Sequence, residues 1–157
     1  MATIPGGGVV TLPGEARSIE VGGFQVIVHA DSDATDAAFS LIETVEPDAG
    51  VGPPLHVHRD CAESFLVLAG RYRMHLDGTD FECPPGSFVY VPRGMSHTFQ
   101  TLEPGSRKLN LYTPAGMVGY FDELAAGIAA GLDDAGLDPI AGRFEMDVVG
   151  PVPDGYL

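Results

Sequence analysis

Short runs of alternating apolar and polar residues follow one another through most of this chain, and glycine or proline separates each run from the next. A period of two is typical of half-buried β-strands, and strands spaced this closely favour an all-β sandwich or barrel. The Asp77-Gly78 pair between two such runs predicts a tight hairpin. The pattern predicts strands over residues 18–29, 39–46, 55–58, 64–69, 71–76, 79–83, 87–91, 96–102 and 108–112. Residues 18–29 form either a strand pair or one kinked strand, with Gly22-Gly23 as the turn or bend.

The pattern changes after residue 112. Four apolar residues then recur at helical spacing and form one stripe: Met117, Phe121, Leu124 and Ile128. Thr113 is a suitable N-cap with Pro114 as the first helical residue, and Gly131 is a natural end. We therefore predict a helix that covers the outside of the barrel or a dimer partner. A further short strand is expected over residues 144–149.

The chain has 157 residues, which suits one domain with a single core. We divide it into an extended arm over residues 1–15, rich in glycine and proline, a β-barrel over 16–113, and a C-terminal helix and tail over 114–157. The arm and the helix are the elements expected to lie at an interface between subunits. The residues alone do not decide the oligomeric state.

The formal net charge of −14 disfavours binding to nucleic acids and to anionic membrane surfaces. No signal peptide is visible in the first 13 residues, and no apolar run approaches the roughly 18 residues that span a bilayer. We therefore expect a cytoplasmic protein with no membrane partner. The two cysteines, Cys61 and Cys83, have no metal-binding spacing, so reduced thiols are favoured, although a disulfide between neighbouring strands stays open.

His56 and His58 are the first residues that indicate chemistry. On a strand, two residues at i and i+2 point to the same face, about 6.6 Å apart along the backbone. Glu63 follows five residues later and would arrive from the next strand. Two imidazoles and a carboxylate that converge in this way are typical of a metal site and not of a packing pattern.

The spacing around these residues is specific. The first block has the spacing G-x5-H-x-H-x4-E-x6-G, and it runs from Gly50 through His56, His58 and Glu63 to Gly70. The second block has the spacing G-x5-P-x-G-x2-H, and it runs from Gly86 through Pro92 and Gly94 to His97. This pair of blocks resembles the two signature motifs of the cupin superfamily, and the resemblance covers residues 39–112. The second motif often ends in Asn where this chain has Thr101.

The resemblance implies a cupin fold, which is a jelly-roll or double-stranded β-helix barrel, and a homodimer. Two segments are similar to the small bacterial single-domain cupins labelled quercetin-2,3-dioxygenase-like. They are LHVHR with the residues that follow it, and YTPAG with its helix. The four glycines that bracket the ligand strands are expected to reverse the chain. They are Gly50, Gly70, Gly86 and Gly94.

The resemblance also implies a metal held by His56, His58, Glu63 and His97. Three imidazoles and one carboxylate suit one divalent transition ion (Fe, Ni, Mn, Co, Cu or Zn) and do not suit Ca²⁺ or Mg²⁺. Octahedral geometry would leave two positions open for water, substrate or dioxygen. His29 and His75 lack this support and are interpreted as structural or solvated.

Strand alternation suggests the wall of a substrate pocket. Phe65 and Val67 share the face of Glu63, and Phe99 shares the face of His97. Met95 lies in the turn beside His97. The hydroxyl groups of Tyr72 and Tyr112 are candidate hydrogen-bond donors to a bound oxygen. A role in core packing is an equally good interpretation of the apolar residues, because a barrel must fill its interior.

These observations favour a metal-dependent dioxygenase of the quercetinase-like kind that uses dioxygen on a small enolic, catecholic or flavonol-type molecule. Glu63 would act as a ligand or, once released, as the general base that takes the hydroxyl proton. Two alternatives stay open: a non-redox isomerase, cyclase or lyase that uses the metal as a Lewis acid, and a binding cupin without catalysis.

Overall fold

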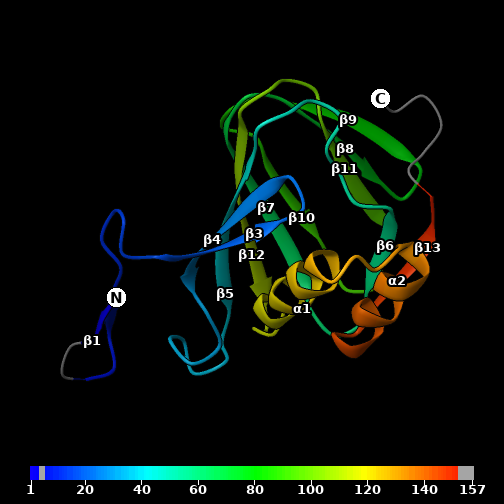
Figure 1. The fold of residues 1–157 in the computed structure, drawn as a ribbon. Coiled ribbons are helices and arrows are strands. Elements are labelled where there is room, and N and C mark those ends of the chain that lie inside the picture. The colour runs from blue at the N-terminus through cyan, green and yellow to red at the C-terminus, as the bar shows by residue number, and fades with distance from the viewer. Residues whose placement is uncertain (4–5, 152–157) are drawn as a thin grey trace.

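Two antiparallel sheets face each other in the computed structural model, which describes residues 1–3 and 6–151 (Figure 1). The larger sheet has the strand order β10-β7-β12-β5-β4-β3, and the smaller has the order β13-β6-β11-β8-β9. The first contains β3 (Arg17–Val21), β4 (Phe24–Ala30), β5 (Ser40–Glu46), β7 (Ala62–Ala69), β10 (Phe88–Val91) and β12 (Ser106–Thr113). The second contains β6 (Leu55–His58), β8 (Tyr72–Leu76), β9 (Thr79–Cys83), β11 (His97–Thr101) and β13 (Met146–Gly150). The predicted all-β fold is confirmed.

Each strand predicted from alternation is present, and the turns between them use the expected residues. Of the two alternatives for residues 18–29, the strand pair is present, as β3 and β4 joined at Gly22-Gly23. All four motif glycines have positive φ angles, a conformation that suits the expected chain reversals. Gly70 has a second reason to be glycine, because a Cβ there would lie 2.1 Å from the hydroxyl oxygen of Ser106. The glycines of the motifs therefore serve tight reversals and close backbone contacts.

The C-terminal helix exists, but its predicted start is wrong. Thr113 is the last residue of β12, where it pairs with Ala62 of β7, so it cannot cap a helix. The helix α1 (Val118–Ala129) begins four residues after Pro114, its predicted first residue, and Met117 is its N-cap. It ends where predicted, since Gly131 has a φ of +77° and its N–H bonds to the Ile128 carbonyl.

A second helix, α2 (Asp134–Arg143), was not predicted. Its N-cap Asp133 accepts a hydrogen bond from the N–H of Gly136, and Pro139 lies inside it. The helix α1 packs against β3, an edge of the larger sheet, and α2 packs against β13, an edge of the smaller one. The two helices therefore cover the side on which these edges lie (Figure 1).

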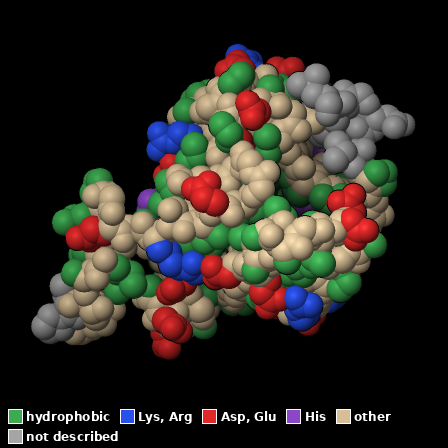
Figure 2. Space-filling view, viewed as in Figure 1, with side chains coloured by type: hydrophobic (Ala, Val, Ile, Leu, Met, Phe, Trp, Pro, Cys, Tyr) green, Lys and Arg blue, Asp and Glu red, His purple; other side chains and the backbone are tan. Residues whose placement is uncertain are grey.

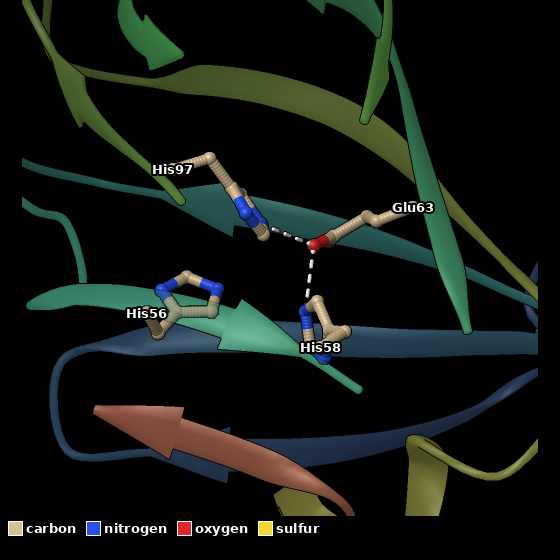
Figure 3. Close-up of side chains that lie close together, drawn as sticks. All are labelled: His56, His58, Glu63 and His97. Carbon is tan, nitrogen blue, oxygen red and sulfur yellow. Dashed lines mark hydrogen bonds and ion pairs between the residues drawn. The ribbon is translucent and has the colours of Figure 1, made fainter. Parts of the chain in front are cut away.

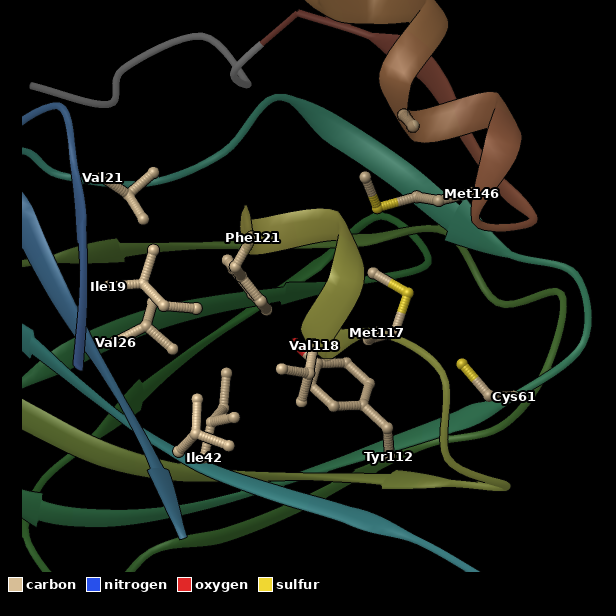
Figure 4. Packing of buried hydrophobic residues seen from close by; sticks show 12 residues of the cluster. Ile19, Val21, Val26, Ile42, Cys61, Tyr112, Met117, Val118, Phe121 and Met146 are labelled. Carbon is tan, nitrogen blue, oxygen red and sulfur yellow. The ribbon is translucent and has the colours of Figure 1, made fainter. Parts of the chain in front are cut away.

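Apolar residues from α1 complete the larger of two hydrophobic clusters (Figure 4). Val118 and Phe121 lie against Ile19, Val26 and Ile42 of the larger sheet. The smaller cluster fills the interior farther along β7 and β8. Its buried members are Phe65, Val67, Tyr72, Met74, Cys83 and Val91.

The first residues form a small hairpin of β1 (Ala2–Thr3) and β2 (Val9–Val10), which projects away from the two large sheets (Figure 1). Asp and Glu side chains are scattered over the face shown in Figure 2, as the net charge requires. Neither helix in the described part of the chain is long or apolar enough to cross a membrane. Cys61 and Cys83 are buried free thiols, so a disulfide between them is absent.

Candidate metal site

The four predicted ligands come together between the two sheets. His56 and His58 lie on β6, His97 begins β11 directly opposite His56, and Glu63 lies near the start of β7 in the other sheet. One nitrogen or oxygen from each residue lies within 4.8 Å of the others, and all four residues are buried. Figure 3 shows the three rings and the carboxylate pointing toward one another.

The spacing within this cluster fits a metal ion. Nε2 of His58 and Nε2 of His97 each lie 3.1 Å from Oε2 of Glu63. Neighbouring ligands of an octahedral ion with bonds of about 2.1 Å are about 3.0 Å apart. Two ligand pairs, His58 with Glu63 and His97 with Glu63, thus already stand at about the separation that such an ion imposes.

Hydrogen bonds to backbone carbonyls set the tautomers of two rings. Nδ1 of His56 lies 2.9 Å from the Pro54 oxygen, and Nδ1 of His97 lies 3.0 Å from the Met95 oxygen. A carbonyl oxygen only accepts, so each Nδ1 carries the hydrogen and each neutral ring keeps a lone pair on Nε2. The lone pairs on His97 Nε2 and Glu63 Oε2 therefore need a cation between them, either a proton or a metal.

The protonation states also suit metal binding. Burial, together with the neighbouring His97 and His58, lowers the pKa of His56 to about 3, so this ring is neutral at pH 7. Burial acts to raise the pKa of Glu63, but hydrogen bonds and charges from His58 and His97 outweigh it and hold that pKa well below its usual value. The cluster thus offers a carboxylate at Glu63 and a neutral imidazole at His56, the forms that bind metals.

Asn110 on β12 holds the other oxygen of Glu63, and the sequence interpretation did not include it. Its Nδ2 donates to Glu63 Oε1 at 2.8 Å. The side chain is 2% exposed, and its Oδ1 has no hydrogen-bond partner among the described residues. Nδ1 of His58 is also buried and also lacks a hydrogen-bond partner among the described residues. Alternation from Tyr112, which was singled out, would have placed Asn110 on the inner face.

A cavity of about 890 Å³ opens beside the cluster. Its wall includes His56, His58 and Glu63 on the barrel side and apolar residues of both helices on the other, among them Phe121, Leu124, Ile128 and Leu137. Two of the six predicted pocket residues, Phe99 and Tyr112, line this cavity. The other four lie in or against the smaller hydrophobic cluster. They are Phe65, Val67, Tyr72 and Met95.

The interior also holds a buried ion pair that the sequence interpretation missed. Lys108 Nζ donates to Glu46 Oε1 at 2.7 Å and to Thr44 Oγ1 at 2.6 Å, and it lies 3.7 Å above the ring of Phe99. The Tyr72 hydroxyl donates to the second oxygen of Glu46 at 2.5 Å. The Tyr72 hydroxyl is thus committed to Glu46, whereas Thr44, Glu46 and Phe99 line the cavity.

Comparison with known proteins gives the following matches. The family described as Cupin domain matches residues 41–108. Quercetin 2,3-dioxygenase from Bacillus subtilis is 29% identical over 107 residues, which cover 68% of this chain but only 31% of that protein.

Solved structures agree on the fold. KdgF from Halomonas sp. matches with a TM-score of 0.62 and 22% identity, over 68% of this chain and 94% of that one. The nucleoside dehydratase Pac13 from Streptomyces matches with a TM-score of 0.56 and 9% identity, over 88% of each chain.

Proposed function

Because this chain is a small cupin of the quercetin-dioxygenase-like type, we propose that it is a metal-dependent oxygenase. Its substrate would be a small enolic, catecholic or flavonol-type molecule, with dioxygen as the second reactant. The observation that carries this proposal is a buried three-histidine, one-glutamate cluster at the wall of a cavity of about 890 Å³. A cavity of this size lies within the usual range for small-molecule sites.

The chemistry of the donor set supports the proposal. Nitrogen and oxygen ligands of this kind suit a divalent transition metal, held by His56, His58, Glu63 and His97. Such an ion supplies Lewis acidity, which lowers the pKa of a substrate hydroxyl group. Four protein ligands would leave room for small molecules if the coordination is octahedral.

Glu63 is the proposed general base. A carboxylate whose pKa lies well below its usual value is a weak base by itself, so it can accept a proton only from an acidified hydroxyl group. The apolar wall, to which Phe99 and Phe121 contribute, would hold an aromatic ring and exclude water.

The metal assignment is tested by quantifying metal in the purified protein and in the variants His56→Ala and Glu63→Ala. We expect bound metal near one ion per chain in the wild type and at least a tenfold loss of metal affinity in each variant. His75→Ala is a matched control, since His75 lies on β8 and bonds to Asp80 at 2.6 Å. Unchanged metal content in both ligand variants would refute the assignment.

The reaction class is tested by measuring oxygen uptake with a panel of flavonols, catechols and enols, using the protein loaded separately with Fe, Ni, Mn, Co, Cu and Zn. Uptake that depends on a redox-active metal supports the oxygenase. Turnover without uptake, with zinc sufficient, would replace it with a non-redox lyase, cyclase or isomerase. Tight binding without turnover across the panel would indicate a binding cupin.

A further inference from the structure

Asn110 presents a buried acceptor that the rest of the site does not use. A carboxylate oxygen only accepts hydrogen bonds, so the amide nitrogen must face Glu63, and the 2.8 Å contact fixes the side chain in this orientation. The amide oxygen, Oδ1, is then directed elsewhere. It has no partner among the described residues, although the side chain is almost fully buried and lines the cavity.

An unpaired buried carbonyl oxygen is costly, by an amount comparable to a lost hydrogen bond. The nearby hydroxyl of Tyr112 does not relieve it, because that oxygen accepts from the amide nitrogen, at 3.5 Å, and makes no hydrogen bond to Oδ1. The neighbours of Asn110 across the sheet, Ile42 on β5 and Phe65 on β7, are apolar. A donor must therefore come from the cavity.

We propose that Asn110 Oδ1 accepts a hydrogen bond from a hydroxyl group of the substrate, on the carbon next to the one whose oxygen meets the metal site. Asn110 lines the cavity and donates to Oε1 of Glu63, while Oε2 of the same carboxylate is the candidate metal ligand. One carboxylate and one amide therefore link the metal site to the unpaired acceptor. A substrate with oxygens on adjacent carbons would bring one to the metal site and the other to this acceptor. The substrate class is thus a catechol or an enediol, and a simple phenol or enol fits less well.

This inference rests on the proposed metal site, and a pair of probes separates the two. Catechol carries the adjacent hydroxyl donor, whereas 2-fluorophenol replaces it with a fluorine of similar size that cannot donate. Dissociation constants would be measured by calorimetry under anaerobic conditions, on metal-loaded and on metal-free protein. For the wild type we expect catechol to bind about tenfold more tightly than 2-fluorophenol.

Asn110→Ala should reduce this preference to about twofold or less, in keeping with the loss of one hydrogen bond. If the variant also loosens Glu63, the affinities for both probes change together. The ratio of the dissociation constants of catechol and 2-fluorophenol therefore reports the loss of the Oδ1 acceptor alone. Gln100→Ala is the control, because Gln100 is a second buried amide that alternates with Phe99 on β11 and faces away from the cavity. That variant should keep the tenfold preference.

A crystal structure of the wild type with catechol provides a readout that needs no variant. A catechol oxygen within 3.2 Å of Asn110 Oδ1 supports the inference. It is overturned if both catechol oxygens contact the ligand residues, if Oδ1 meets only a water, if the preference survives Asn110→Ala, or if catechol binds neither form of the protein. Catechol bound through Asn110 in a protein that takes up no metal would keep the inference and refute the proposed oxygenase.

Discussion

Lys108 shows how a single buried charge is accommodated in this barrel. It is fully buried, and its ammonium group is surrounded by Glu46, Thr44 and the face of Phe99. Burial lowers the pKa of Lys108 below its usual value, and the charge and hydrogen bond of Glu46 act against this shift. Removing one member would leave the other charge without its partner in the interior.

We therefore expect Lys108→Met to lower the free energy of unfolding by about 3–5 kcal/mol. Glu46→Gln keeps an acceptor for the Tyr72 hydroxyl, and the double variant should lose clearly less stability than the sum of the two single variants. Urea unfolding of all four proteins measures this coupling. Strictly additive losses would mean that the two side chains act independently.

Cys61 lies near the candidate ligands but is predicted to be inert. Burial, with the charges of Asp60 and Glu63, raises the pKa of its thiol to about 12. At pH 8 only about one thiol in ten thousand is ionised, compared with about one in four for an unperturbed cysteine. In a Cys83→Ser variant at pH 8, iodoacetamide should label Cys61 far more slowly in the native protein than in the urea-unfolded protein, as followed by mass spectrometry.

The sign of the pH dependence follows from the raised pKa. The thiolate fraction increases about tenfold per pH unit below pH 12, so the labelling rate of the native Cys83→Ser protein should rise about a hundredfold between pH 8 and pH 10. Labelling of the native protein at pH 8 as fast as in urea would contradict the burial of this thiol.

At the scale of residues, the sequence was most informative where spacing alone fixes direction. His56 and His58 share a face because a strand alternates, and the fixed motif intervals supplied Glu63 and His97. Asn110 was missed because an amide is not an obvious metal ligand and its register against Glu63 is a long-range property. Phe65 and Val67 do face inward as predicted, but alternation cannot tell a cavity wall from a packed cluster.

The helix α1 contains two glycines that its packing explains. A Cβ at Gly127 would lie 2.9 Å from Leu137, 3.1 Å from Ile140 and 3.2 Å from Leu132. A Cβ at Gly119 would lie 2.9 Å from the ring of Phe144. These glycines lower the intrinsic helix propensity, but they allow α2 and the residues after it to approach α1 closely.

Gly142 in α2 is a matched position without such neighbours, since nothing lies within 4 Å of a Cβ built there. We expect Gly142→Ala to raise the free energy of unfolding by up to about 1 kcal/mol through helix propensity. Gly127→Ala gains the same propensity but must displace three side chains, so it should be the less stable of the two. Thermal or urea unfolding compares them, and equal stability would show that the contact between the helices is loose.

The elements themselves illustrate which local signals are overridden. Thr113-Pro114 has the composition of a helix start, yet the pairing of β12 with β7 extends through Thr113 and delays α1 until Val118. The helix α2 has a sound N-cap in Asp133, but Gly136, Pro139 and Gly142 obscure its apolar periodicity. Its stability depends on packing against α1 and β13, which no local pattern encodes.

For the whole molecule, the candidate ligands connect the two sheets. His56, His58 and His97 belong to the smaller sheet, and Glu63 belongs to the larger one. A bound ion would therefore join the two halves of the fold and stabilise the protein globally, by about 4 kcal/mol at a free concentration of 1,000 times the dissociation constant.

We expect the melting temperature to rise when a divalent transition metal is added to chelator-treated protein, as measured by scanning calorimetry. The rise should be absent in Glu63→Ala at the same metal concentration. A rise of equal size in that variant would place the stabilising ion elsewhere, and no rise with any of the six metals would contradict the site.

The α1–α2 pair supplies one wall of the cavity, while all four candidate ligands come from strands. Substitutions at Leu124, Ile128 or Leu137 can therefore change which molecule fits without altering the donor atoms. Homologous chains that keep the same four candidate ligands need not share a substrate, because evolution can vary the helical wall of the cavity without changing the ligands. For protein engineering, a library restricted to these two helices would be the natural route to new specificity.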